Sequence, residues 1–182
     1  MQTREKNVGG RSIEISTSAQ HLRVFDEDRE IASFIVSTSK FGVGSSEGSN
    51  MTPLGDFEIG EKIGEGAALM TIFKGREPVG VYDPVQSSKE DLVMTRILWL
   101  HGSEVHNANT RGRYIYIHGT NQEHFLGQPA SFGCIRMANE DVVDLFPPAK
   151  GCPFHRRCPR HIGDICDNET PPWQSTGLGH AI

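Results

Sequence analysis

The chain has 182 residues, of which 36% are hydrophobic, and it contains 20 glycines and 10 prolines. This length suits one domain with a sizeable core, and the glycine and proline content favours a loop-rich fold built from strands. A net charge of −5 and a pI near 5.9 argue against nucleic acid as an electrostatic partner. No apolar run reaches the roughly 18 residues of a membrane span.

The N-terminal part predicts a flexible end followed by strands. Residues 1–10 are polar and are expected to be flexible. Three short strands should follow, formed by the alternating segment 12–17, the run around Leu22 and Val24, and the apolar stretch 31–38. An acidic turn lies between the last two, so we expect them to form a hairpin.

The middle of the chain alternates between loops and further strands. The glycine- and serine-rich segment 39–49 is interpreted as a surface loop, and strands are predicted at 56–59 and 69–73. The polar stretch 75–89 is strand-like only at residues 79–82, and it is either a wall or lid of a substrate cleft or a solvated insertion. Residues 92–100 form the longest predicted strand, which should be central because both of its faces are apolar.

The next segment contains a histidine and a cysteine that are candidates for a catalytic pair. Residues 114–118 alternate as a strand that places Tyr116 and His118 on one face. Cys134 follows sixteen positions after His118, and turns between them could fold the chain back. Such a pair is what thiol acyl transfer needs, although a buried structural cysteine and an ordinary strand-end histidine would give the same pattern.

The neighbours of Cys134 include candidate partners for this chemistry. An ordinary thiol, with a pKa of about 8.5, is mostly protonated at neutral pH, and an adjacent imidazole can accept its proton. The backbone N–H groups of Gly133 and Cys134 are candidate donors to an oxyanion. Thr120 or Ser131 could add a hydroxyl to the site. The Arg136 side chain could hold a substrate carboxylate in a bidentate contact.

A short helix is predicted after this segment. Asn139 is a suitable N-cap, and Glu140 and Asp141 place negative charge in the first helical turn. Pro147 and Pro148 should end the helix.

Several motifs together resemble those of one enzyme family. Residues 117–120 (IHGT) and 131–137 (SFGCIRM) are similar to the signature of YkuD-type L,D-transpeptidases, and 52–57 (TPLGDF) and 139–141 (NED) extend the match. The resemblance covers about residues 11–148. It implies a mainly β catalytic domain, a sandwich of two mixed sheets with a short helix after the cysteine.

The resemblance also implies an activity that requires no cofactor. Cys134 would be the nucleophile and His118 the general base, acting on peptidoglycan stem peptides. Cys134 would attack the carbonyl before a terminal D-Ala and pass the acyl group to an amine of a second stem, giving a 3-3 cross-link through a thioester. Gly133 would contribute to the oxyanion site, Arg136 or a tyrosine such as Tyr116 would orient the donor, and carbapenems are expected inhibitors. Two alternatives are an L,D-carboxypeptidase or endopeptidase that uses water as acceptor, and a catalytically silent murein-binding module.

Two features depart from what the family would lead one to expect. The family usually has a second histidine directly before the Gly-Cys pair, where this chain has Phe132. The family also implies a place in the cell envelope, whereas the first 25 residues lack the apolar core of a secretory signal. A removed leader, another export route or a start further upstream would each account for the second departure.

Residues 149–182 are interpreted as a separate cysteine- and histidine-rich tail. It contains Cys152, Cys158 and Cys166, so that Cys134 stands alone in the main domain, as suits a reactive thiol. The tail resembles the C-terminal cysteine segment of oligopeptide and dipeptide ABC-transporter ATPases, but the chain has no phosphate-binding GxxxxGK[ST] loop and ATPase function is not inferred. Three thiols and a histidine could bind zinc or an iron–sulfur centre, as in a metal-dependent interaction protein. The alternative is a disordered tail.

Overall fold

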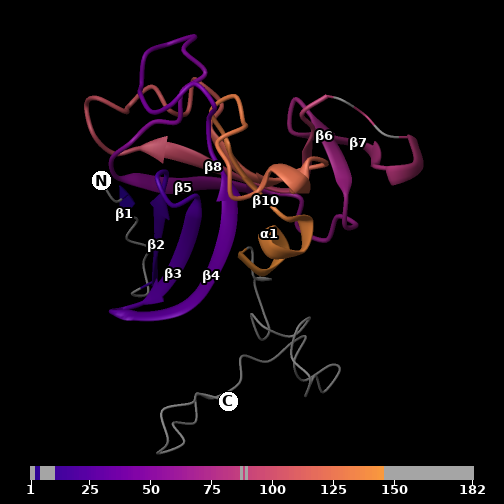
Figure 1. Cartoon of the computed structure of the whole chain (residues 1–182), viewed down its shortest axis with the longest axis horizontal. Coiled ribbons are helices and arrows are strands. Elements are labelled where there is room, and N and C mark those ends of the chain that lie inside the picture. The colour runs from indigo at the N-terminus through magenta and orange to yellow at the C-terminus, as the bar shows by residue number, and fades with distance from the viewer. Residues whose placement is uncertain (1–2, 5–10, 87, 89, 146–182) are drawn as a thin grey trace, which may run out of the picture. The chain divides into compact units, whose positions relative to one another are not determined.

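The structure is a computed structural model that describes residues 3–4, 11–86, 88 and 90–145 (Figure 1). The chain divides into two units, Met1–Val143 and Asp144–Ile182. Of the second unit, only residues 144 and 145 are described, so the cysteine-rich tail, with its three thiols that are candidate metal ligands, lies outside the described residues.

The N-terminal strands form an antiparallel layer. Its members are β1 (Thr3–Arg4), β2 (Arg11–Ser16), β3 (His21–Asp26) and β4 (Arg29–Ser37). Each strand pairs with the next, so the three predicted strands and their hairpin are confirmed. Thr3 and Arg4 pair with β2, so the segment predicted to be flexible contains a short strand.

The second layer is organised around the longest strand. It contains β5 (Phe57–Ile63), β6 (Thr71–Lys74), β7 (Glu77–Val81), β8 (Val93–Gly102), β9 (Tyr116–Gly119) and β10 (Ile135–Met137). Strand β8 pairs with β5, β6 and β9, which confirms its predicted central place. Strand β10, directly after Cys134, was not predicted, because three residues are too few for an alternating pattern to be recognised.

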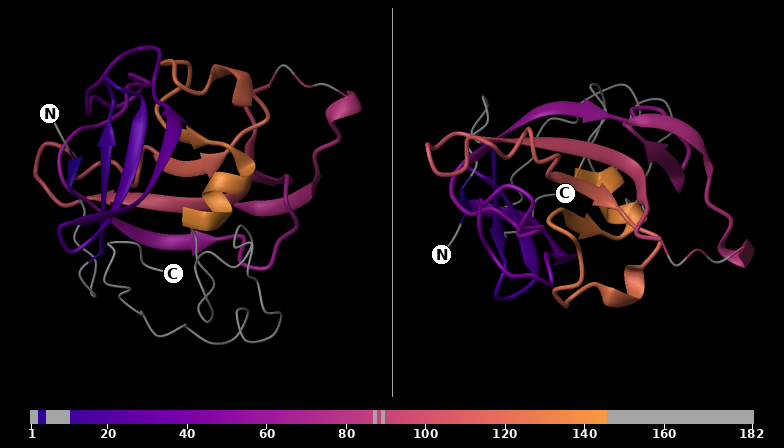
Figure 2. Two further views of the ribbon diagram at one scale, coloured as in Figure 1. Left: turned by 60° about the horizontal axis from the view of Figure 1, so that its bottom comes forward. Right: turned by 90° about the horizontal axis from the view of Figure 1, so that it is seen from above.

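Hydrogen bonds join the two layers through β4 and β10. The strand order is β1-β2-β3-β4-β10-β9-β8-β6-β7, with β5 paired to β8. Among the described strands, every pairing is antiparallel except that of β9 with β10, so the parallel part of this mixed sheet lies at the strands that carry His118 and lead out of Cys134. The predicted mainly β, mixed fold is confirmed, with the two layers continuous in one ten-stranded sheet. Figures 1 and 2 show β2, β3 and β4 running across β5 and β8.

The core between the layers fixes β10 from one side. Ile15 of β2, Phe57 of β5, Leu100 of β8 and Ile135 of β10 line a small space between the layers and are all buried. Burying side chains of this size stabilises the fold by roughly 1.5–3 kcal/mol each. Because Ile135 belongs to this core, the adjacent Cys134 is held in place by packing.

Segment 75–89 begins with the turn and the second strand of a hairpin. Strands β6 and β7 pair, and the 3₁₀ helix η1 (Pro84–Gln86) follows. The strand-like stretch predicted at residues 79–82 is therefore confirmed. Every residue of β7 is exposed, and this hairpin lies at the opposite end of the strand path from β1 (Figure 2).

A short helix follows β10 as predicted, but its first turn is capped differently. Helix α1 spans Asn139–Leu145, and its predicted C-terminal prolines lie outside the described residues. The Asn139 side chain donates to the Thr120 carbonyl and to Glu123 of the 3₁₀ helix η2 (Glu123–Phe125). Glu123 also accepts from the Asn139 backbone N–H at 2.8 Å. The cap of the first turn is therefore Glu123, and Asn139 instead ties the helix to the end of β9.

No helix in the described part of the chain is long and apolar enough to cross a membrane.

Candidate active site

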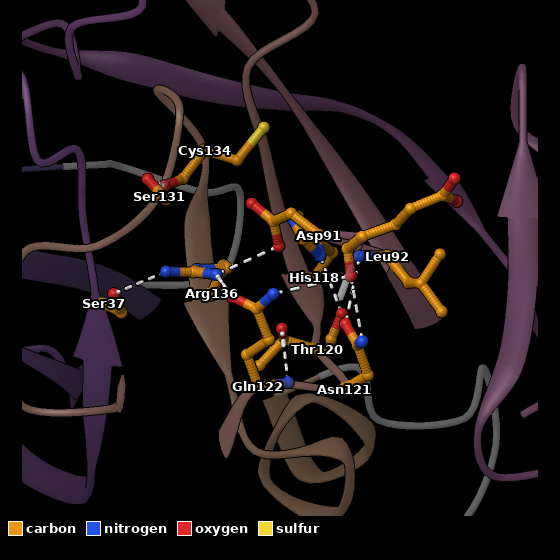
Figure 3. Close-up of polar contacts among 12 residues, drawn as sticks. Ser37, Asp91, Leu92, His118, Thr120, Asn121, Gln122, Ser131, Cys134 and Arg136 are labelled. Atoms are coloured by element: carbon orange, nitrogen blue, oxygen red, sulfur yellow. Dashed lines mark hydrogen bonds and ion pairs between the residues drawn. The ribbon is translucent and has the colours of Figure 1, made fainter. Parts of the chain in front are cut away.

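The parallel pairing of β9 and β10 places the predicted pair, His118 and Cys134, on and directly before adjacent strands. Ile117 lies opposite Ile135 and His118 opposite Arg136, so Cys134, one step earlier, is level with Tyr116. The Tyr116 backbone N–H donates to the Cys134 sulfur at 3.4 Å. The Cys134 thiol in turn donates to the Tyr114 carbonyl, also at 3.4 Å. The sulfur therefore lies against the strand that carries His118 (Figure 3).

The turn before Cys134 needs a glycine and is closed by a serine. Gly133 has φ +123°, and a Cβ there would lie 3.1 Å from the Ile115 side chain. The Ser131 hydroxyl donates to the Cys134 carbonyl at 2.6 Å and accepts from the Gly133 N–H at 3.2 Å. Thr52 donates to the Gly133 carbonyl at 3.0 Å from the other side. Hydrogen bonds from Ser131 and Thr52 thus fix the backbone at both Gly133 and Cys134.

These bonds change the predicted roles of three residues. The Gly133 N–H is already used by Ser131, whereas no hydrogen bond joins the Cys134 amide to another residue of the described part. Of the two candidate oxyanion donors, the Cys134 amide is therefore the one available. Ser131 and Thr120 are fully buried, and the Thr120 hydroxyl accepts from the Gln122 N–H at 3.1 Å. Both hydroxyls support the backbone and do not face a substrate.

His118 is held as a neutral base. Its Nδ1 lies 2.7 Å from the Gly119 carbonyl oxygen. Because a carbonyl can only accept, Nδ1 carries the proton and Nε2 is unprotonated in the neutral ring. Burial lowers the pKa of His118 below its ordinary 6.5, and the Arg136 charge acts in the same direction, against the opposing effects of the Gly119 bond and Asp91. The imidazole is therefore neutral at pH 7.

Cys134 is correspondingly held as a thiol. Its side chain is half-buried. Burial raises the pKa of Cys134 to about 11, although the Tyr116 N–H bond opposes the shift. The Asp91 charge raises this pKa further, and the charges of Arg136 and Arg113 lower it. The resting pair is thus a neutral thiol beside a neutral imidazole and not a thiolate–imidazolium ion pair.

This protonation state predicts a distinctive alkylation profile. The rate of Cys134 modification by iodoacetamide should rise about tenfold per pH unit through pH 9 and 10, because only the thiolate reacts. The plateau should come near the folded pKa of about 11. Peptide mapping by mass spectrometry would follow Cys134 separately from the three tail cysteines. The same peptide in the unfolded chain, where the plateau should fall near about 8.5, is the control. A plateau below pH 8 in the folded protein would contradict the neutral pair.

Arg136 is placed differently from its predicted role. Its side chain is 1% exposed, and Nη1 contacts Asp91 at 3.0 Å and Gln122 at 2.9 Å (Figure 3). Its Nη2 donates to the Ser37 hydroxyl at 3.3 Å. A guanidinium so engaged has no free edge for a substrate carboxylate, so the structure does not support that prediction for Arg136. It forms a buried ion pair beside the cysteine and histidine.

Aromatic side chains form a wall next to the sulfur. Trp99 of β8 stacks on Tyr114, with ring centroids 5.8 Å apart, and meets Tyr116 edge to face at 5.6 Å. Cys134 packs against the cluster that contains Trp99 and Tyr116. Tyr116, predicted to contact substrate, is 8% exposed and accepts from Arg76 at 3.4 Å, whereas Tyr114 is 55% exposed. Tyr114 is therefore the more accessible of the two tyrosines.

The residue in place of the usual second histidine faces outward. Phe132 is 52% exposed and packs on Phe41 with ring centroids 5.7 Å apart. The Lys40 ammonium lies 4.0 Å from the centroid of the Phe132 ring. This position therefore offers a cation and two apolar rings, and no group that could take up a proton near neutral pH.

Sequence reasoning missed two residues at this site. Asp91 directly precedes the predicted central strand, and an acidic residue there carries no recognisable signal without its partner Arg136. Arg76 lies in the hairpin turn, and nothing local in the sequence places it near Cys134. Within the described ranges, no group of three or more metal-ligating side chains is found.

Comparison with known proteins gives consistent results. The family model of the YkuD L,D-transpeptidase catalytic domain matches residues 10–151. A putative L,D-transpeptidase of Bacillus subtilis, YqjB, is 57% identical over 37 residues, which are 20% of this chain and 21% of that protein. The residues quoted above for the resemblance lie in the range that the family model matches.

Solved structures of similar proteins include three L,D-transpeptidases. The alignment with the L,D-transpeptidase of Xylanimonas cellulosilytica covers 80% of this chain and 53% of the solved chain, with 18% identity and a TM-score of 0.46. The alignment with the enzyme from Mycobacterium smegmatis covers 78% of this chain and 51% of that enzyme, with 12% identity and a TM-score of 0.42. The alignment with LdtMt1, which was solved in complex with imipenem, covers 78% of this chain and 51% of LdtMt1, with 14% identity and a TM-score of 0.41. The chain thus spans about half the length of these solved proteins. On the family match over most of its length, the chain belongs to the L,D-transpeptidase family and contains its YkuD-type catalytic domain.

Proposed function

We propose that this chain is a cysteine acyltransferase that cross-links peptidoglycan stem peptides through a thioester on Cys134. The observation that carries the proposal is the position of the Cys134 sulfur, held against β9 two residues before His118 on the same strand face. Family membership supports the same reaction class. No other described cysteine competes for the role.

The protonation states support general-base catalysis. As the thiol attacks the donor carbonyl, the S–H proton passes to Nε2 of His118 and a C–S bond forms. The tetrahedral oxyanion accepts a hydrogen bond from the Cys134 N–H. Collapse breaks the C–N bond to the terminal D-Ala, and His118 returns the proton to the leaving amine. A neutral imidazole with a lowered pKa suits this sequence, because it is ready to accept the proton at pH 7.

The second half of the reaction regenerates the thiol. An acceptor amine of another stem attacks the thioester while His118 takes its proton. The C–S bond then breaks, and the proton passes to the departing sulfur. Because the pKa of Cys134 is raised to about 11, the sulfur leaves readily only if it is protonated as it departs. The same histidine thus serves as base and then acid in both halves.

Peptidoglycan as substrate and a place in the cell envelope form part of this proposal. They are supported by the family to which the chain belongs. We further propose that carbapenems acylate Cys134, since one similar protein was solved in complex with imipenem. The exposed Tyr114 and the aromatic wall of Trp99 offer surface for either kind of acyl donor.

Intact-mass spectrometry tests the proposal directly. Incubation with a tetrapeptide stem should add the mass of the acyl donor less D-Ala, and imipenem should add its own mass. Peptide mapping should place both adducts on Cys134, and both should be lost in Cys134→Ser. A product of cross-linking should form when an acceptor amine is present, and free tripeptide alone would identify water as the acceptor. If a folded wild-type protein gave no adduct with either donor, the acyltransferase proposal would be refuted and the alternative of a silent murein-binding module would gain.

A further inference from the structure

One arginine near the site occupies a backbone position that normally favours glycine. The turn between β6 and β7 consists of Gly75 and Arg76, with φ values of +57° and +73°. A two-residue hairpin turn with both φ values positive usually has Asn or Asp followed by Gly. A left-handed backbone at a residue with a Cβ is unfavourable, and such outliers collect at functional sites. The turn places the Arg76 side chain at a fixed point of the hairpin tip.

From this point the guanidinium reaches the aromatic wall beside Cys134. Its Cζ lies over the Trp99 ring, 4.5 Å from the centroid, and 5.5 Å from the centroid of Tyr114. Nη1 donates to the Tyr116 hydroxyl at 3.4 Å. Tyr116 is the residue whose backbone N–H bonds to the Cys134 sulfur. Arg76 and Cys134 therefore both adjoin Trp99 and Tyr116.

Arg76 also differs from the other arginines around the site in its lack of partners. The others are engaged: Arg111 pairs with Glu61 at 2.8 Å, Arg113 donates to the carbonyls of Gly44 and Met51, and Arg136 pairs with Asp91. Besides its ring contacts, Arg76 makes one long hydrogen bond, to Tyr116, and no ion pair within the part of the chain that the structure describes. Most of its five N–H donors thus remain open to a ligand.

We propose that Arg76 binds a carboxylate of the acyl-donor peptide and so selects donors in which that group is free over donors in which it is amidated. The inference rests on the proposed function and names the residue that recognises its donor. A planar guanidinium that lies over aromatic rings and keeps most of its N–H donors open suits bidentate binding of a carboxylate. It fills the role predicted for Arg136, which is buried and already paired.

The test compares donors and variants in one experiment. Tetrapeptide donors carry the side-chain carboxylate of the third residue free or amidated, and the terminal carboxylate free or amidated. The second-order rate constant for Cys134 acylation is measured by intact mass for wild type, Arg76→Gln and Arg76→Gly. Lys74→Gln is the matched control, because it removes one positive charge from an exposed position of the same hairpin. Arg76→Gly removes the unfavourable side chain from the left-handed position, so its melting temperature should equal or exceed that of wild type.

Replacing Arg76 should slow acylation only with donors in which the recognised carboxylate is free. Amidation of the recognised carboxylate should slow wild-type acylation about 10- to 100-fold, as expected for a charge-assisted contact. Both Arg76 variants should be slowed similarly with the free donor and should discriminate less than about threefold between free and amidated forms. Lys74→Gln should behave like wild type. Which amidation matters identifies the carboxylate.

Other outcomes would overturn the inference in distinguishable ways. If free and amidated donors acylate the wild-type protein at equal rates, the role of Arg76 is refuted and the proposed function stands. The same holds if Lys74→Gln lowers the acylation rate as much as Arg76→Gln does. If the Arg76 variants are slowed equally with every donor, the residue supports the site without recognising a carboxylate. If wild type is acylated by no donor, the proposed function fails and this inference fails with it.

Discussion

Replacing His118 with glutamine is expected to slow acylation of Cys134 by about 10²- to 10⁴-fold, the usual contribution of a positioned general base. Glutamine can still donate a hydrogen bond to the Gly119 carbonyl, but it cannot accept the thiol proton. Because the pKa of Cys134 is raised to about 11, almost no thiolate exists at pH 7 to replace the lost base. The measurement is the second-order rate constant for acylation by imipenem and by a tetrapeptide donor.

The pH profile separates loss of the base from damage to the fold. Since the pKa of His118 lies below its ordinary 6.5, wild-type acylation should stay level as the pH falls through 6.5 and should decline only below it. In His118→Gln this decline should be absent, and the rate should rise with thiolate toward the pKa of Cys134. Alkylation by iodoacetamide at pH 10 should be similar in both proteins. His21→Gln, in the N-terminal layer, is the matched control and should keep the wild-type profile. Wild-type acylation rates in His118→Gln would refute the assigned role.

Local patterns in the sequence accounted for much of the fold. The strands β2 to β4 follow from period-two alternation and an acidic turn, which act between residues close in the chain. Strand β8 follows from its length and its two apolar faces, and these same features make it the strand with most partners. The motifs around His118 and Cys134 identified the family, and the parallel pairing of β9 with β10 places the two residues on adjacent strands.

What the sequence could not supply depends on contacts between distant segments. Arg136 looked like a ligand for a substrate carboxylate until its partner Asp91, 45 positions away, was known. The hydroxyls of Ser131 and Thr120 face the backbone because of turn geometry, which residue type alone does not determine. Arg76 reaches the site only because a tight turn directs it there. In each case the residue type was informative, but its partner decided the role.

The ion pair between Asp91 and Arg136 carries the largest expected effect on stability. Replacing Asp91 with asparagine should lower the free energy of unfolding by about 3–5 kcal/mol, the usual loss when one partner of a buried pair is removed. The Arg136 side chain is 1% exposed, and a guanidinium cannot escape by losing its proton. Its Nε already lacks a hydrogen-bond partner among the described residues, so none of them supplies a further acceptor that could compensate.

The reverse substitution should cost less and so provides the comparison. In Arg136→Met the remaining carboxylate of Asp91 is 22% exposed and can be hydrated or protonated, and methionine fills most of the vacated volume. Urea unfolding of both single variants and of the double variant gives the coupling between the two charges. A loss below about 1 kcal/mol in Asp91→Asn would contradict the buried-pair argument.

Asp91→Asn should also change the reactivity of the Cys134 thiol in a predictable direction. Asp91 raises the pKa of Cys134 and Arg136 lowers it, so removing Asp91 leaves the lowering charge unopposed. The iodoacetamide plateau of Asp91→Asn should therefore move below that of wild type, while that of Arg136→Met should move above it. Asp91 also raises the pKa of His118, so the acidic decline in acylation should shift to lower pH in Asp91→Asn. Opposite shifts in the two single variants cannot come from general loosening of the fold, which would move both plateaus toward the value of an unfolded thiol.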